Sequence, residues 1–133
     1  MKITRRDFLA AGATTVAFSA AESPFAQRGE AMYGLIGKMI AADGKRDELV
    51  AILLGSVANM PGCLSYIIAK DTGDPNAIWI TEAWDNKESH DASLSLAAVK
   101  EAIARGRPLI AGFSDRVETT PVGGRGLTAP KGR

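Results

Sequence analysis

The residues best suited to chemistry lie in and just after one apolar segment, NAIWITEAWDN at residues 76–86. If this segment is a strand, Glu82 points the same way as Ile80 and Trp84, so its carboxyl group has apolar neighbours. Burial raises the pKa of a carboxyl group, which would make Glu82 a candidate general base. The alternative is a structural role, in which Glu82 accepts hydrogen bonds from the backbone or from a Tyr or Arg across a dimer.

Five other residues complete the predicted site: Trp84, His90, Tyr33, Tyr66 and Asn86. Trp84 is predicted to line a cavity, with plain core packing as the alternative. His90 is the one histidine of the chain and is suited to proton transfer, unless it is an exposed helix residue. The hydroxyl groups of Tyr33 and Tyr66 are candidate substrate donors or simply satisfied packing residues. Asn86 either begins a helix or adds a polar group to the cavity.

Composition excludes several classes of protein. The chain has 133 residues, 46% of them hydrophobic, which predicts one globular domain. A net charge of +1 and the absence of a basic patch exclude a nucleic-acid partner. The single cysteine, Cys63, cannot form an intrachain disulfide, and the lack of a Cys/His cluster predicts no metal site.

Residues 1–26 are predicted to be an export signal. Three cations precede a mildly apolar stretch that is too short for a membrane span, so no stable membrane anchor is expected. The run TRRDFL at residues 4–9 resembles a twin-arginine translocation signal, with an ordinary amphipathic helix as the alternative. That resemblance implies the twin-arginine export machinery as a partner and a periplasmic or secreted protein, cleaved after Ala21 or Ala26.

The remaining sequence predicts a ferredoxin-like α+β fold of order β-α-β-β-α-β. The predicted elements are a strand at 31–42, a helix at 45–59, strands at 63–70 and 76–84, a helix from about 86 to 104, and a weak strand at 112–119. Asp85 and Glu88 have the spacing of a capping box at the start of the second helix. Residues 120–133 are rich in Gly and Pro and are predicted to be a flexible tail or an arm that lies on a partner.

The strands carry apolar side chains on both faces, although the predicted helices cover only one. An uncovered apolar face of this size indicates an interface, so we expect a homodimer formed sheet against sheet. A pocket between the sheet and the helices, or between the two sheets, is the expected ligand site.

The segment from Met60 to Ser89 resembles the antibiotic biosynthesis monooxygenase family. The likeness rests on Pro61-Gly62-Cys63 after a helix, the strand Leu64-Ser65-Tyr66, the Asp74-Pro75 hairpin, and Glu82-x-Trp84 before a capped helix. The resemblance covers about residues 31–119 and implies a dimeric α+β barrel. We therefore assign residues 27–119 to one domain of this type.

The resemblance also implies a reaction. Some members of the family oxidise quinols or polycyclic phenols with O2 and use no metal or flavin cofactor, so the expectation is an exported, cofactor-independent monooxygenase acting on a small aromatic substrate. Many members carry a histidine at the position of Ser93 here, and His90 lies three residues earlier. The missing histidine argues against haem degradation. It also leaves an alternative, a non-catalytic periplasmic dimer that binds a small hydrophobic ligand.

Overall fold

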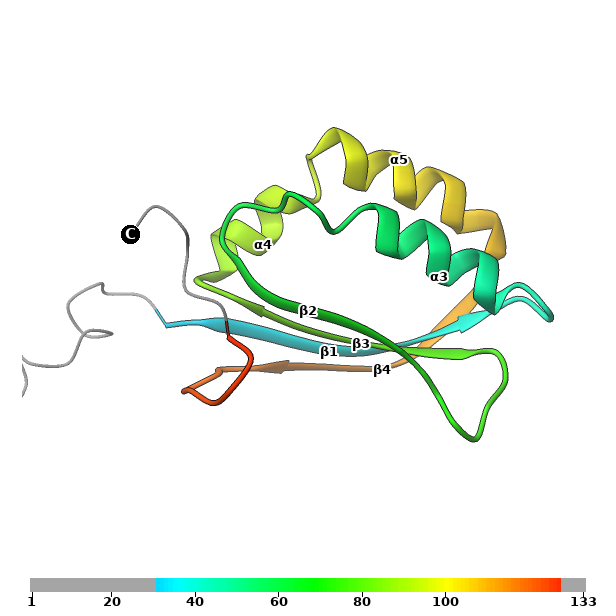
Figure 1. Cartoon of the computed structure of the whole chain (residues 1–133), viewed down its shortest axis with the longest axis horizontal. Coiled ribbons are helices and arrows are strands. Elements are labelled where there is room, and N and C mark those ends of the chain that lie inside the picture. The colour runs from blue at the N-terminus through cyan, green and yellow to red at the C-terminus, as the bar shows by residue number, and fades with distance from the viewer. Residues whose placement is uncertain (1–30, 128–133) are drawn as a thin grey trace, which may run out of the picture. The chain divides into compact units, whose positions relative to one another are not determined.

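A four-stranded sheet with α-helices on one face forms the structure that we describe, a computed structural model covering residues 31–127 (Figure 1). The predicted export signal and residues 128–133 lie outside the described residues. The elements in chain order are β1 (Tyr33–Ala41), α3 (Arg46–Gly55), β2 (Cys63–Lys70), β3 (Ala77–Trp84), α4 (Lys87–Ser93), α5 (Ala97–Gly106), the 3-10 turn η1 (Arg107–Leu109) and β4 (Ile110–Thr119). None of the helices within residues 31–127 has the length and hydropathy needed to cross a bilayer.

The strands are ordered β2-β3-β1-β4, and each neighbouring pair is antiparallel. The chain therefore has the predicted ferredoxin-like α+β fold. The helices lie on the same side of the sheet (Figure 1), so the opposite face of the sheet has no helix over it within the described chain. We call that second side the open face.

The second predicted helix is in fact two helices. α4 ends at Ser93 and α5 begins at Ala97. The Ser93 hydroxyl donates a hydrogen bond of 2.6 Å to the His90 carbonyl, and Leu96 has an extended backbone with ψ of 140°. A serine bonded back to its own helix competes with continuation of that helix, so the break at residues 94–96 follows from local chemistry.

The first helix ends at Gly55, earlier than the predicted residue 59. The Ser56 hydroxyl bonds to the Leu53 carbonyl at 2.8 Å, and its backbone N–H donates to the same oxygen. Gly55 weakens the helix because its backbone loses more freedom on folding than that of other residues. Residues 56–62 are therefore left to form the turn that leads into β2.

The core lies between α3 and the centre of the sheet. Leu49 from α3 and Ile78 from β3 are fully buried, and Ala41 and Ile80 pack with them. In β1 and β3 the core residues alternate with residues of the open face, as the period of a strand requires.

The strand register places polar residues in one row beneath the helices. Tyr66 pairs with Glu82, Glu82 with Leu35, and Leu35 with Glu118. Paired residues of antiparallel strands share a face. The row therefore carries two carboxyl groups on the side of the sheet that the helices cover. The next row, made of Ile67, Thr81, Ile36 and Val117, is on the open face.

The second tryptophan, Trp79, is on the open face and is held at its polar edge. Its indole N–H donates to Asp71 at 2.7 Å, and the Lys38 ammonium lies 5.4 Å from the ring centroid. The Trp79 bond and two backbone N–H bonds from the hairpin lower the pKa of Asp71 to about 2. Asp71 therefore remains ionised and fixes the hairpin between β2 and β3 to the open face.

Gly62 fixes the path of the chain into β2. It has φ of +85°, its carbonyl accepts from the Asp85 N–H at 2.9 Å, and a Cβ at this position would collide with the Ser89 side chain in α4. Only glycine combines the left-handed backbone with this close approach. The turn after α3 is thereby joined to the beginning of α4.

Replacing Gly62 by Ala is expected to destabilise the protein by about 2 kcal/mol or more, because a left-handed backbone strains any residue with a Cβ and Ser89 must also move. Gly55→Ala is the matched control, since a Cβ there meets nothing and favours the helix by about 0.5–1 kcal/mol. Urea unfolding of the two variants measures both effects. Equal stability of Gly62→Ala and the wild type would show that the turn tolerates a side chain.

Candidate functional site

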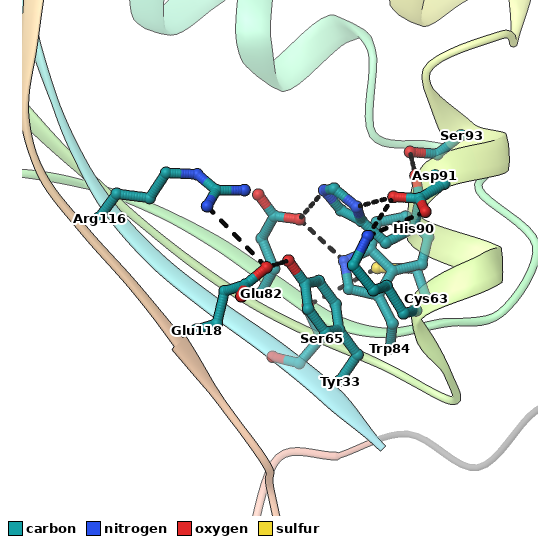
Figure 2. Close-up of polar contacts among 11 residues, drawn as sticks. Tyr33, Cys63, Ser65, Glu82, Trp84, His90, Asp91, Ser93, Arg116 and Glu118 are labelled. Atoms are coloured by element: carbon teal, nitrogen blue, oxygen red, sulfur yellow. Dashed lines mark hydrogen bonds and ion pairs between the residues drawn. The ribbon is translucent and has the colours of Figure 1, made fainter. Parts of the chain in front are cut away.

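The predicted catalytic residues meet where β3 passes into α4. Glu82 and Trp84 leave β3 on the face beneath the helices, and α4 begins three residues after Trp84. Asn86 caps α4 by accepting a 2.8 Å hydrogen bond from the Ser89 N–H. The cap turns the chain sharply, so His90, one turn into the helix, lies back over the end of the strand (Figure 2).

Four contacts define the geometry of this cluster. The Trp84 indole N–H donates to Glu82 Oε1 at 2.8 Å, and His90 Nε2 lies 3.8 Å from the same oxygen. The His90 ring meets Trp84 edge-on with centroids 5.5 Å apart and lies 5.1 Å from the Tyr33 ring. The side chains of His90 and Glu82 are only 12% and 11% exposed. The histidine therefore points into the protein.

The environment of Glu82 suits a proton acceptor. Burial raises the pKa of its carboxyl group, while the Trp84 hydrogen bond and the neighbouring His90 and Arg116 side chains act in the opposite direction. Trp84 and His90 both approach Oε1, and no described residue donates a hydrogen bond to Oε2. One oxygen is thus held in place while the other is available to a substrate.

A cavity of about 720 Å³ lies between the sheet and helices α3 and α5. Most of its wall is apolar, with Leu35, Met39, Leu49, Leu53, Ile80, Val99, Ile103 and Phe113 among the lining residues. The polar part of the wall includes Glu82, Tyr66 and Arg116. A small aromatic molecule fits the volume and chemistry of such a site.

The cavity divides the predicted site residues into two groups. Glu82 and Tyr66 line its wall, whereas Trp84, His90, Tyr33 and Asn86 are not among the lining residues. Glu82 therefore connects the cavity with the aromatic cluster behind it. Tyr66 also remains a neutral donor, because burial raises the pKa of its hydroxyl far above the ordinary value of 10.0.

Tyr33 has a protein partner. Its hydroxyl donates a 2.7 Å hydrogen bond to Glu118, and its ring packs between His90 and the Lys87 ammonium. Burial and the Glu118 carboxylate raise the pKa of the Tyr33 hydroxyl. In this structure Tyr33 orients its neighbours from outside the cavity.

Two residues of β4, Arg116 and Glu118, also belong to the site, although neither is among the residues predicted from the sequence. Arg116 lines the cavity and lies 3.9 Å from Glu118. The sequence feature that could have identified them is their spacing in the segment DRVET, because residues two positions apart share one face of a strand. The side chains of Arg116 and His90 approach Glu82 from opposite sides (Figure 2).

The side chains of Ser93 and Cys63 contact backbone carbonyl groups and have structural roles. Ser93 is 5% exposed and bonds to the His90 carbonyl. Burial raises the pKa of the Cys63 thiol, which contacts the Ser65 carbonyl at 3.6 Å, so Cys63 is a poor nucleophile. A β-bulge at the start of β2 sets Cys63 opposite Trp84. Within residues 31–127, no group of three or more acidic, His or Cys residues could hold a metal ion.

Comparison with known proteins assigns the chain to a family. The family model for antibiotic biosynthesis monooxygenases matches residues 32–105. A search of curated protein sequences gives no match.

Solved structures agree with the family model. A protein of Chloroflexus aurantiacus J-10-fl, described as a candidate antibiotic biosynthesis monooxygenase, is 62% identical over 72% of this chain and 98% of its own, with a TM-score of 0.71. A Caulobacter crescentus CB15 protein with the same description shares the fold at 20% identity, covering 71% of this chain and 92% of its own with a TM-score of 0.65. This chain therefore belongs to the antibiotic biosynthesis monooxygenase family.

Proposed function

We propose that this protein is a cofactor-independent monooxygenase that oxidises a quinol or polycyclic phenol with O2. The observation that carries the proposal is Glu82, a carboxylate with a raised pKa in the wall of a largely apolar cavity. Such a group can remove the proton of a bound phenol, and the apolar wall limits the access of water. The family membership supports the same reaction class.

The reaction begins when Glu82 Oε2 takes a hydroxyl proton from the substrate. The resulting phenolate transfers one electron to O2, and the superoxide formed combines with the ring radical to give a hydroperoxide. Loss of water leaves a hydroxyquinone. For a quinol, one oxygen atom of O2 enters the ring and the other leaves as water with two hydrogens of the substrate, so the substrate supplies all four electrons.

The residues around Glu82 orient its carboxylate and can remove the proton that it accepts. The Trp84 N–H orients the carboxylate by binding Oε1, and Tyr66 is a neutral donor in the same wall. His90 lies between two carboxyl groups, with Nε2 3.8 Å from Glu82 and Nδ1 3.1 Å from Asp91. We assign His90 to receive the proton from Glu82 and pass it toward Asp91, which is exposed.

Glu82→Gln is expected to lower kcat/KM for quinol oxidation by about 100-fold or more, the usual contribution of a general base. The wild-type rate should rise with pH through the raised pKa of Glu82, since only the ionised carboxylate accepts a proton, and the variant should lose this dependence. Oxygen uptake with 1,4-naphthalenediol, corrected for spontaneous oxidation, measures both. Glu48→Gln, an exposed residue of α3, is the control.

Thermal unfolding separates this effect from misfolding. Because the folded-state pKa of Glu82 exceeds its ordinary value of 4.5, the stability linked to its protonated form is complete below pH 4.5 and is lost as pH rises through the folded-state pKa. The Tm of Glu82→Gln relative to the wild type should therefore increase across this interval. A folded Glu82→Gln protein with unchanged turnover would overturn the proposed role of Glu82.

The second candidate is a non-catalytic protein that binds a small hydrophobic ligand. Ser93 favours it, because a buried hydroxyl bonded to a helix carbonyl occupies the position at which the family resemblance implies a histidine. A ligand that is retained in native mass spectra and unaltered after exposure to air would support this function and exclude the oxygenase.

We also propose that the open face binds an identical subunit. Ile67 and Val117 on this face are 55% and 54% exposed, and Ile36 lies between them in the same row. A row of apolar side chains that crosses a sheet face from one edge strand to the other and is exposed at both ends is costly in water and is typical of an interface. Two-fold pairing covers the same patch on both chains.

Ile67→Lys is expected to raise the dissociation constant of this dimer at least about tenfold, because each subunit would then bury an unpaired charge. Leu54→Lys is a closely matched control: Leu54 is 56% exposed, but it lies on α3, on the covered side of the sheet. Light scattering at micromolar concentrations measures the molecular mass of each variant and so distinguishes dimer from monomer. A monomeric wild-type protein would rule out the dimer.

We further propose that residues 1–26 direct export by the twin-arginine pathway, so that the enzyme acts in the periplasm or outside the cell. The support is the run TRRDFL at residues 4–9. Replacing Arg5 and Arg6 together by Lys is expected to retain the protein in the cytoplasm, as measured by cell fractionation and immunoblotting in a bacterium with this pathway. Lys2→Gln is the control, and unaltered export of the Arg5/Arg6 variant would contradict the proposal.

A further inference from the structure

Arg116 lies where a second polar group of the ligand would be bound. It lines the cavity from β4 and pairs in register with Gly37 of β1, which is also a lining residue. Because Gly37 has no side chain, the space beside Arg116 on the covered face is open toward the middle of the sheet. In Figure 2 the guanidinium group extends toward the Glu82 carboxylate from the side opposite His90.

The donors of Arg116 are available for a ligand. Its nearest acidic partner, Glu118, is 3.9 Å away, which is too long for a hydrogen bond. Glu118 Oε2 already accepts the Tyr33 hydroxyl at 2.7 Å. Across residues 31–127, Arg116 donates no hydrogen bond, and its side chain is 62% exposed. An arginine has five N–H groups in a planar fork, and that fork matches a carboxylate.

Glu82 and Arg116 interact electrostatically but form no ion pair. The charge of Arg116 acts to lower the pKa of Glu82, yet the two side chains form no ion pair with each other. A ligand placed between them can donate a hydroxyl proton to the carboxylate and present a negative charge to the guanidinium. Each protein group is then paired with its complement.

We propose that the substrate is an aromatic hydroxy acid, a quinol that carries a carboxylate on its ring, and that Arg116 binds this carboxylate. The inference rests on the proposed function, because it names the protein group that binds a second polar group of the same substrate. Glu82 faces the hydroxyl, the apolar wall contacts the rings, and the guanidinium holds the carboxylate by two hydrogen bonds.

Binding without oxygen tests this inference separately from catalysis. The full-length protein is titrated anaerobically with 1,4-dihydroxy-2-naphthoate and with 1,4-naphthalenediol, which lacks the carboxylate, and affinity is measured by calorimetry. We expect the wild type to bind the acid at least about tenfold more tightly than the diol. Arg116→Gln should weaken binding of the acid by about 10–100-fold and leave the diol nearly unchanged.

Two further variants complete the test. Arg116→Lys keeps the charge and loses the fork, so it should recover only part of the preference for the acid. Arg105→Gln removes one charge from α5 at a position outside the cavity wall and should bind both compounds as the wild type does. Circular dichroism verifies that each variant is folded.

The outcomes separate the two proposals. Equal wild-type affinity for the two compounds, no binding of either, or equal weakening of both by Arg116→Gln would overturn the inference. The same holds if Arg105→Gln reproduces the effect of Arg116→Gln. Selective binding of the acid without oxygen uptake in air would overturn the proposed oxygenase and leave the assignment of Arg116 standing.

Discussion

The site depends on one short contact, the 2.8 Å hydrogen bond from the Trp84 indole to Glu82 Oε1. Both residues belong to β3 and are two positions apart, so they share a face of the sheet. A buried carboxylate is tolerated when part of its hydrogen-bonding capacity is satisfied, and here Oε1 accepts the indole N–H while the residue lines the cavity. The same strand thus supplies the reactive group and the donor that orients it, and no loop intervenes between them.

The elements around β3 extend this arrangement. Gly62 allows the turn before β2 to lie against Ser89, and Asn86 begins α4 immediately after the strand. Together they direct α4 so that its histidine covers the indole ring. On the other side, the edge strand β4 contributes a guanidinium group and a carboxylate. Glu82 and Arg116 consequently lie in the wall of the same, largely apolar cavity.

Much of the fold could be predicted from the sequence, because alternation in strands and the turn signals at Pro61-Gly62 and Asp74-Pro75 are local properties. The grouping of Glu82 with Trp84 followed from the same period. The inward direction of His90 could not be predicted, since it depends on the angle at which α4 leaves β3. The break after Ser93 depended on one side-chain hydrogen bond to a helix carbonyl. Arg116 was missed because its surroundings come from β1 and β3, which are distant in sequence.

The two tryptophans occupy different faces of β3, and each has its own acidic partner. Trp84 is 1% exposed and bonded to Glu82, and Trp79 lies on the open face and is bonded to Asp71. The chain contains no other indole. Its tryptophan fluorescence is therefore the sum of two emitters, one bonded to the Glu82 carboxyl group on the covered face and one on the open face, where a partner subunit would lie. Replacing either ring by Phe would leave a protein that reports optically on a single side of the same strand.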